Sequence, residues 1–261
     1  MRKWILAILM MVLVVAASSS RCAAADVDLT VYTDEPSHVI SPVLYGLFFE
    51  DINFAADGGL YAELIRNRSF EFENSLFGWS TVEQKGGQVQ LEVLDEKPLN
   101  ANNPHYLRLT TSGNGAPVGI KNAGYHGIVV KKGSRYLFSV YARSANEFDG
   151  ILFVRLESKS GDILGQTRIG RINADWQKYS AMIESKADEE DAELVLLLRG
   201  NGSIDLDMVS LFPEDTWKRQ SNGLRADLVQ MLADMKPSFI RFPDCRFLCP
   251  VGGCYQCCID R

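Results

Sequence analysis

One stretch near the amino terminus constrains the fold more than any other part of the chain. An apolar run at residues 43–49 ends in two carboxylates, Glu50 and Asp51, and a glycine-containing turn follows. Apolar residues then recur at helical spacing over residues 60–65. A buried strand that leads into an amphipathic helix is the unit of α/β barrels, in which acids at the strand's carboxyl end lie where substrate binds. An ordinary strand and helix with solvated acids fits the same spacing.

A second helix and strand are predicted near the carboxyl terminus. Apolar residues recur at helical intervals over residues 224–235, and Ser221 or Asn222 can cap the start of this helix. A proline ends the helix, and a strand follows at residues 238–242. Arg241 lies near the carboxyl end of that strand.

The residue identities in these two segments are more specific than the spacing of their apolar residues. The sequence LYGLFFEDINFAADGGLYAELIRNRSFEF at residues 44–72 resembles the opening of the glycoside hydrolase family 51 α-L-arabinofuranosidases. The sequence LRADLVQMLADMKPSFIRFP at residues 224–243 resembles the next helix and strand of the same (β/α)8 barrel. The resemblance implies a retaining enzyme that releases terminal α-L-arabinofuranosyl groups from arabinan or arabinoxylan.

The resemblance also implies which active-site residues the chain carries. Glu50 matches the glutamate that hydrogen-bonds the arabinose, and Arg241 matches the arginine that holds the nucleophile's carboxylate. The family's two catalytic glutamates have no counterpart in this sequence, and an eight-stranded barrel takes roughly 250 residues by itself. We therefore expect a fragment of the enzyme that has no catalytic residue and no activity of its own, and the family implies no cofactor.

The middle of the chain, residues 77–213, has a different pattern. Alternating runs predict strands at residues 106–110, 136–142, 151–156, 177–183, 194–198 and 204–211. Short strands separated by turn residues at this spacing are typical of an antiparallel β-sandwich or jelly roll. The motifs GSRYLFSVYAR at residues 133–143 and IDLDMVSL at residues 204–211 resemble the jelly-roll carbohydrate-binding modules of families 4, 9 and 22.

Four aromatic residues of this region are candidates for stacking on sugar rings: Trp79, Tyr125, Tyr141 and Trp176. A core position is the alternative for both tryptophans.

Two acids of the same region, Asp205 and Asp207, alternate on one strand and could bind a structural calcium ion. A solvated strand face is the alternative, and no other metal site is predicted outside the cysteine-rich tail.

The amino terminus has the three-part layout of a secretory signal peptide at residues 1–25. Arg2 and Lys3 precede an apolar run that is short for a transmembrane helix, and small residues follow it. We expect the mature chain to start near Asp26 and to be secreted, with an uncleaved anchor as the alternative. Residues 27–32 alternate as a half-buried strand would.

The net charge of −6 argues against nucleic acid or an anionic membrane as the partner. It suits a neutral ligand such as an arabinose-containing polysaccharide.

The carboxyl-terminal residues 244–261 no longer resemble the family. Five cysteines crowd into these residues: Cys245, Cys249, Cys254, Cys257 and Cys258. A change of reading frame or a truncation, a set of disulfide bonds, and a zinc site are the three interpretations of this tail.

The expected fold class is therefore α/β plus all-β, with incomplete barrel pieces at residues 26–76 and 214–243 on either side of an inserted β-sandwich. The function this implies is that of a secreted α-L-arabinofuranosidase. The alternative function is a non-catalytic carbohydrate-binding protein that works through the β-sandwich.

Overall fold

The computed structural model describes residues 28–34, 38–83, 86–113, 115–146 and 148–241. The chain divides into Met1–Pro42 and a compact unit at Val43–Arg261. The predicted signal peptide and the cysteine-rich tail lie outside the described residues. The strand predicted at residues 27–32 is wrong for residues 28–32, which are exposed and form no strand, because no described strand pairs with them.

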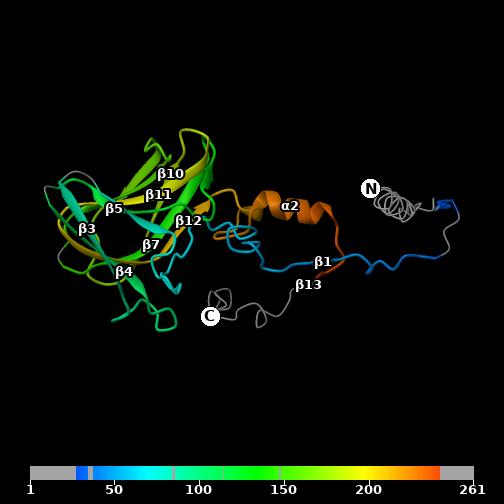
Figure 1. Ribbon diagram of the computed structural model, residues 1–261, viewed down its shortest axis with the longest axis horizontal. Coiled ribbons are helices and arrows are strands. Elements are labelled where there is room, and N and C mark those ends of the chain that lie inside the picture. The colour runs from blue at the N-terminus through cyan, green and yellow to red at the C-terminus, as the bar shows by residue number, and fades with distance from the viewer. Residues whose placement is uncertain (1–27, 35–37, 84–85, 114, 147, 242–261) are drawn as a thin grey trace, which may run out of the picture. The chain divides into compact units, whose positions relative to one another are not determined.

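The elements of the compact unit follow one another as shown in Figure 1. They are β1 (Leu47–Phe48), β2 (Trp79–Val82), β3 (Gly87–Leu94), β4 (Tyr106–Gly113), β5 (Val118–Asn122), β6 (Ile128–Val130), β7 (Arg135–Ser144), β8 (Ile151–Glu157), β9 (Ile163–Ile169), β10 (Gln177–Glu184), β11 (Glu189–Arg199), β12 (Gly202–Pro213), the 3-10 turn η1 (Trp217–Arg219), α2 (Ala226–Asp234) and β13 (Ile240–Arg241).

Two antiparallel sheets form the main body (Figure 1). One has the strand order β10-β7-β12-β4-β3, and the other has the order β2-β5-β11-β8-β9 with β6 paired to β11. Alternate side chains of both sheets are buried in one shared core, including Phe138 of β7 and Leu196 of β11. All six strands predicted from the alternating runs are confirmed, and so is the β-rich character of the region. The jelly-roll connectivity stays a prediction.

The helix predicted at residues 60–65 is wrong. Residues 60–72, which we call the strap, form no helix: an irregular run along the sandwich is followed by bends and turns at residues 66–70. The Leu64 N–H donates to the carbonyl of Leu211 at 3.0 Å, and the Ala62 N–H donates to that of Gly223 at 3.2 Å. Distant segments therefore provide the backbone hydrogen bonds that a helix would have made internally.

The strap completes the core of the sandwich. Ile65 and Phe70 are buried within the same apolar cluster as both sheets. The carboxylate of Glu63 is buried as well, and it accepts hydrogen bonds from the Leu211 N–H at 2.9 Å and the Ser210 hydroxyl at 2.5 Å. Burial raises the pKa of the Glu63 carboxyl, and these hydrogen bonds oppose that rise.

The barrel-like segments form a small parallel pair. In this pair Leu47 of β1 lies opposite Ile240 of β13, and Phe48 lies opposite Arg241. The strands predicted at residues 43–49 and 238–242 are thus observed, but they are only two residues long. The burial predicted for the first strand is wrong, since Phe48 is 59% exposed, and Ile240 of the second strand is 46% exposed.

The predicted carboxyl-terminal helix is confirmed as α2, but its predicted capping is wrong. Arg225 is the N-cap residue and makes no side-chain capping bond. Asn222 has a left-handed φ of +52°, and the Arg225 N–H donates to the carbonyl of Leu60 at 2.8 Å. Because the strap binds the Arg225 N–H, the helix begins at Ala226 and not directly after Ser221 or Asn222. No helix in the described part of the chain is long and apolar enough to cross a membrane.

We predict that Phe70→Ala lowers the free energy of unfolding by about 3–5 kcal/mol, because it removes a buried ring from the core. Val129→Ala, at a side chain that is 56% exposed, should cost about 0.5 kcal/mol. Chemical denaturation of the two variants measures both values. Equal losses would show that the strap does not belong to the core.

Candidate functional site

Glu50 and Arg241 lie at the same edge of the small parallel sheet. Glu50 follows β1 after one residue, and Arg241 ends β13. The Phe49 N–H donates to the carbonyl of Arg241 at 2.9 Å, and the Arg241 guanidinium carbon lies 5.8 Å from the centre of the Phe48 ring. Glu50 is half-buried and Arg241 is exposed. The structure thus brings the two predicted site residues to neighbouring strand ends, and their roles stay predictions.

The segment after β1, residues 50–59, forms a tight turn that we call the rim loop. Asp51 accepts the Ala56 N–H at 2.9 Å, so this acid stabilises the turn itself. Asn53 and Phe54 both have left-handed backbone conformations, with φ of +54° and +65°. The Ala55 N–H donates to the carbonyl of Ile52 at 3.2 Å and closes the turn around these two residues. Burial, and secondly the charge of Asp51, raise the pKa of Asp57.

The candidate sugar-stacking aromatics fall into different environments. Trp79 is a core residue, since its ring is buried and its indole N–H donates to the carbonyl of Asn67 at 3.0 Å. The core alternative is therefore confirmed for Trp79. Tyr141 and Trp176 are partly exposed, in β7 and just before β10. Tyr125 follows β5 and packs against Phe54 of the rim loop, with ring centres 5.3 Å apart.

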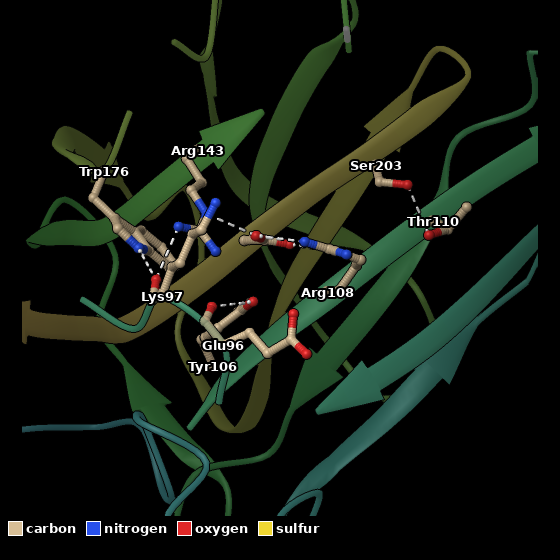
Figure 2. A network of polar contacts seen from close by, with 9 residues as sticks. Glu96, Lys97, Tyr106, Arg108, Thr110, Arg143, Trp176 and Ser203 are labelled. Carbon is tan, nitrogen blue, oxygen red and sulfur yellow. Dashed lines mark hydrogen bonds and ion pairs between the residues drawn. The ribbon is translucent and has the colours of Figure 1, made fainter. Parts of the chain in front are cut away.

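Asp205 of β12 is the centre of a charged network, and Figure 2 labels the two arginines that bind it, Arg108 and Arg143. Its buried carboxylate accepts hydrogen bonds from Arg108 at 2.7 and 3.0 Å and from Arg143 at 2.8 Å. The Arg143 guanidinium also lies 4.5 Å from the Trp176 ring centre and 5.0 Å from that of Tyr106. A solvated strand face is therefore wrong for Asp205, because two arginines balance its charge inside the protein.

Asp207 is also buried, but no cation balances it in the same way. Its Oδ1 accepts the Met208 N–H at 2.6 Å, and its Oδ2 has no partner among the described residues. Burial raises the pKa of Asp207 to about 8. The alternating pattern does not reveal this burial, since a buried acid and a solvated acid look alike in such a strand. The described residues contain no group of three His, Cys, Asp or Glu side chains suited to a metal ion, and the calcium prediction stays untested.

No family model matches the chain. Among curated proteins, the chain is 38% identical over 250 residues to an extracellular exo-α-L-arabinofuranosidase from Streptomyces chartreusis. This alignment covers 93% of this chain and 28% of the relative. It is 37% identical over 231 residues to α-L-arabinofuranosidase 1 from Arabidopsis thaliana, covering 83% of this chain and 32% of the relative.

A solved structure of an arabinose-bound family 51 α-L-arabinofuranosidase, MgGH51, aligns with a TM-score of 0.72 and 34% identity, covering 80% of this chain and 35% of that one. The resemblance to the family 51 arabinofuranosidases is thus confirmed. The chain spans about a third of the length of the curated arabinofuranosidases it matches.

We predict that Asp207 makes the protein less stable as the pH rises. The folded protein keeps this proton up to about pH 8, whereas the unfolded chain releases it near the ordinary value of 3.8. Folding therefore takes up a proton between these two pH values, and stability falls across that window. Asp207→Asn removes this pH dependence. As the pH rises through the window, the free energy of unfolding of the variant should therefore increase relative to that of the wild type by up to about 1.4 kcal/mol per pH unit.

Denaturant titrations of the wild type and Asp207→Asn at about pH 5 and about pH 8 measure the difference. The exposed Asp175, changed to Asn, is the matched control and should follow the wild type at both values. A difference between wild type and Asp207→Asn that does not change with pH would contradict the prediction.

Proposed function

We propose that this chain is the arabinose-recognising part of a secreted, retaining α-L-arabinofuranosidase, and that it does not hydrolyse glycosides by itself. The substrates would be terminal α-L-arabinofuranosyl groups of arabinan or arabinoxylan. The observation that carries the proposal is the pairing of β1 with β13, because it places Glu50 and Arg241 at adjacent carboxyl ends of parallel strands. Substrate chemistry in barrels of this type takes place at that edge.

The two side chains have chemistry suited to these roles. The Glu50 carboxylate can accept hydrogen bonds from sugar hydroxyls, and an ionised acceptor makes such bonds stronger. The Arg241 guanidinium is a cation that would favour the ionised form of a neighbouring carboxylate. In the family, that carboxylate is the nucleophile.

Turnover needs more than these two residues. A retaining glycosidase uses two carboxyl groups roughly 5 Å apart, one as acid and base and one as nucleophile. Asp51, the other acid at this strand end, accepts the Ala56 N–H in the rim loop, and the resemblance assigns both catalytic glutamates to segments without a counterpart here. The expected activity of the chain alone is therefore none.

The predicted signal peptide supports secretion, and one relative is described as extracellular. The acidic net charge supports a neutral polysaccharide partner rather than nucleic acid. We propose no cofactor for the reaction.

We predict that Glu50→Gln weakens the binding of L-arabinose about tenfold, because hydrogen bonds to a charged acceptor contribute about 1.5–3 kcal/mol. The exposed Glu73, changed to Gln, is the matched control and should bind as the wild type does. Ligand-detected NMR titration measures the affinities, and release of nitrophenol from an aryl arabinofuranoside measures turnover. Equal affinity of the two variants would contradict the role of Glu50, and turnover by the pure chain would contradict the predicted inactivity.

A second candidate function is polysaccharide binding by the β-sandwich without catalysis. One observation favours it: Tyr141 and Trp176 are partly exposed, and cationic side chains lie over their rings. The Arg143 guanidinium is 4.5 Å from the Trp176 ring centre, and the Lys178 ammonium is 5.9 Å from that of Tyr141. A cation over one face of a ring occupies that face, so a sugar would stack on the opposite face of each ring.

For this second function we predict that Trp176→Ala abolishes retardation of the chain in an arabinoxylan affinity gel. Trp217→Ala is the matched control, since Trp217 is also partly exposed but lies outside the sandwich, in η1. Thermal melting of both variants shows whether the sandwich stays folded. Equal retardation of wild type and a folded Trp176→Ala variant would exclude Trp176 from binding.

A further inference from the structure

The rim loop turns sharply at two consecutive residues, and the Ala55 N–H closes this turn by donating to the carbonyl of Ile52 at 3.2 Å. Asn53 and Phe54 are consecutive residues with left-handed φ values of +54° and +65°. Such values are uncommon outside glycine, and unfavourable for a bulky residue such as phenylalanine. Strained residues of this kind persist only when the surrounding structure holds them in place. The internal hydrogen bonds shape the turn, and the contacts of the Phe54 ring hold it against its surroundings.

Those surroundings come from the β-sandwich. The ring of Phe54 packs against Tyr125, with ring centres 5.3 Å apart and planes inclined by 60°. It also meets the edge of His126 at 5.6 Å. Both residues belong to residues 123–127, which connect β5 to β6. One aromatic residue of the rim loop is thus held by two side chains of the sandwich.

The backbone of the rim loop contacts the same tyrosine. A Cβ atom placed on Gly58 would lie 2.4 Å from Cγ of Tyr125, so the Tyr125 ring lies directly against the Gly58 backbone. Gly58 also has a φ of +81°, which glycine adopts without strain. Tyr125 therefore packs against both the middle and the end of the rim loop.

A third contact comes from Arg66 of the strap. Its guanidinium carbon lies 4.6 Å from the centre of the Phe54 ring and 4.3 Å from that of Phe77. The backbone of Arg66 is tied to β5, because Asn122 donates to the Arg66 carbonyl at 3.0 Å. Asn122 is completely buried. The cation over Phe54 is thus anchored to the sheet rather than to a mobile surface.

We propose that Tyr125 is a positioning residue for arabinose recognition: its ring fixes the rim loop against the β-sandwich and thereby sets the direction of Glu50. The inference rests on the proposed role of Glu50 in holding the sugar. It gives the sandwich a part in the site through the position of the rim loop. The aromatic ring carries this role, and the hydroxyl is not needed for it.

The test uses the full chain and two independent measurements. Hydrogen–deuterium exchange reports the order of the rim loop without any ligand, and NMR titration reports the affinity for L-arabinose. Tyr125→Ala should speed exchange in the rim loop about tenfold and weaken arabinose binding about tenfold. Tyr125→Phe keeps the ring and should behave as the wild type. Tyr32→Ala, at an exposed tyrosine outside the compact unit, is the control and should change neither measurement.

A second variant separates loop positioning from damage to the sandwich. Gly58→Ala leaves the sandwich sequence intact but pushes the rim loop away from the Tyr125 ring. It should speed exchange in the rim loop while the strands of the sandwich keep their protection. Unchanged rim-loop exchange in Gly58→Ala would overturn the proposal, and so would wild-type affinity in a folded Tyr125→Ala variant.

The two proposals fail in different ways. If the wild-type chain does not bind arabinose at all, the proposed function fails. If it binds arabinose and Glu50→Gln weakens binding, but Tyr125→Ala changes neither exchange nor affinity, only the positioning role of Tyr125 fails.

Discussion

The attachment of the strap to the β-sandwich depends on the burial of the Glu63 carboxyl group. A buried carboxyl group is stable only if its oxygens are hydrogen-bonded, and here the partners are the Leu211 N–H and the Ser210 hydroxyl near the end of β12. The Ile65 N–H adds a third bond from the strap itself at 3.0 Å. One acid thus fixes the strap to the last strand of the sandwich, and with it the chain segment that leads back to the rim loop.

The sequence predicted the sandwich well because its strands obey a local rule. In β7, Phe138, Val140 and Ala142 are buried and alternate with side chains on the other face, which is the pattern that periodicity detects. Other strands depend on contacts that periodicity does not encode. In β5, a Cβ atom on Gly119 would lie 1.9 Å from the carbonyl oxygen of Leu196, so this strand needs a glycine where the pattern predicts a side chain.

The strap shows why a local rule can fail. Its apolar residues fit the spacing of a helix, yet Ile65 is buried against the sandwich and the Leu64 N–H bonds to Leu211, far away in the sequence. Nothing within residues 60–65 decides between the two structures. The candidate site shows the same difference between local patterns and contacts of distant segments. The resemblance identified Glu50 and Arg241, but the burial of Asp207 depends on packing between distant segments, which the spacing of residues does not reveal.

The shared core also links the two candidate functions. Ile65 and Phe70 of the strap belong to the same apolar cluster as both sheets, and Arg66 between them contacts Phe54 of the rim loop. Removing the sandwich would therefore leave the strap's apolar side chains exposed, and removing the strap would open the core of the sandwich. The rim loop between Glu50 and the strap also packs against the sandwich, through Phe54 and Tyr125. If Glu50 binds arabinose as proposed, the β-sandwich is a structural support for that site whether or not its own surface binds polysaccharide.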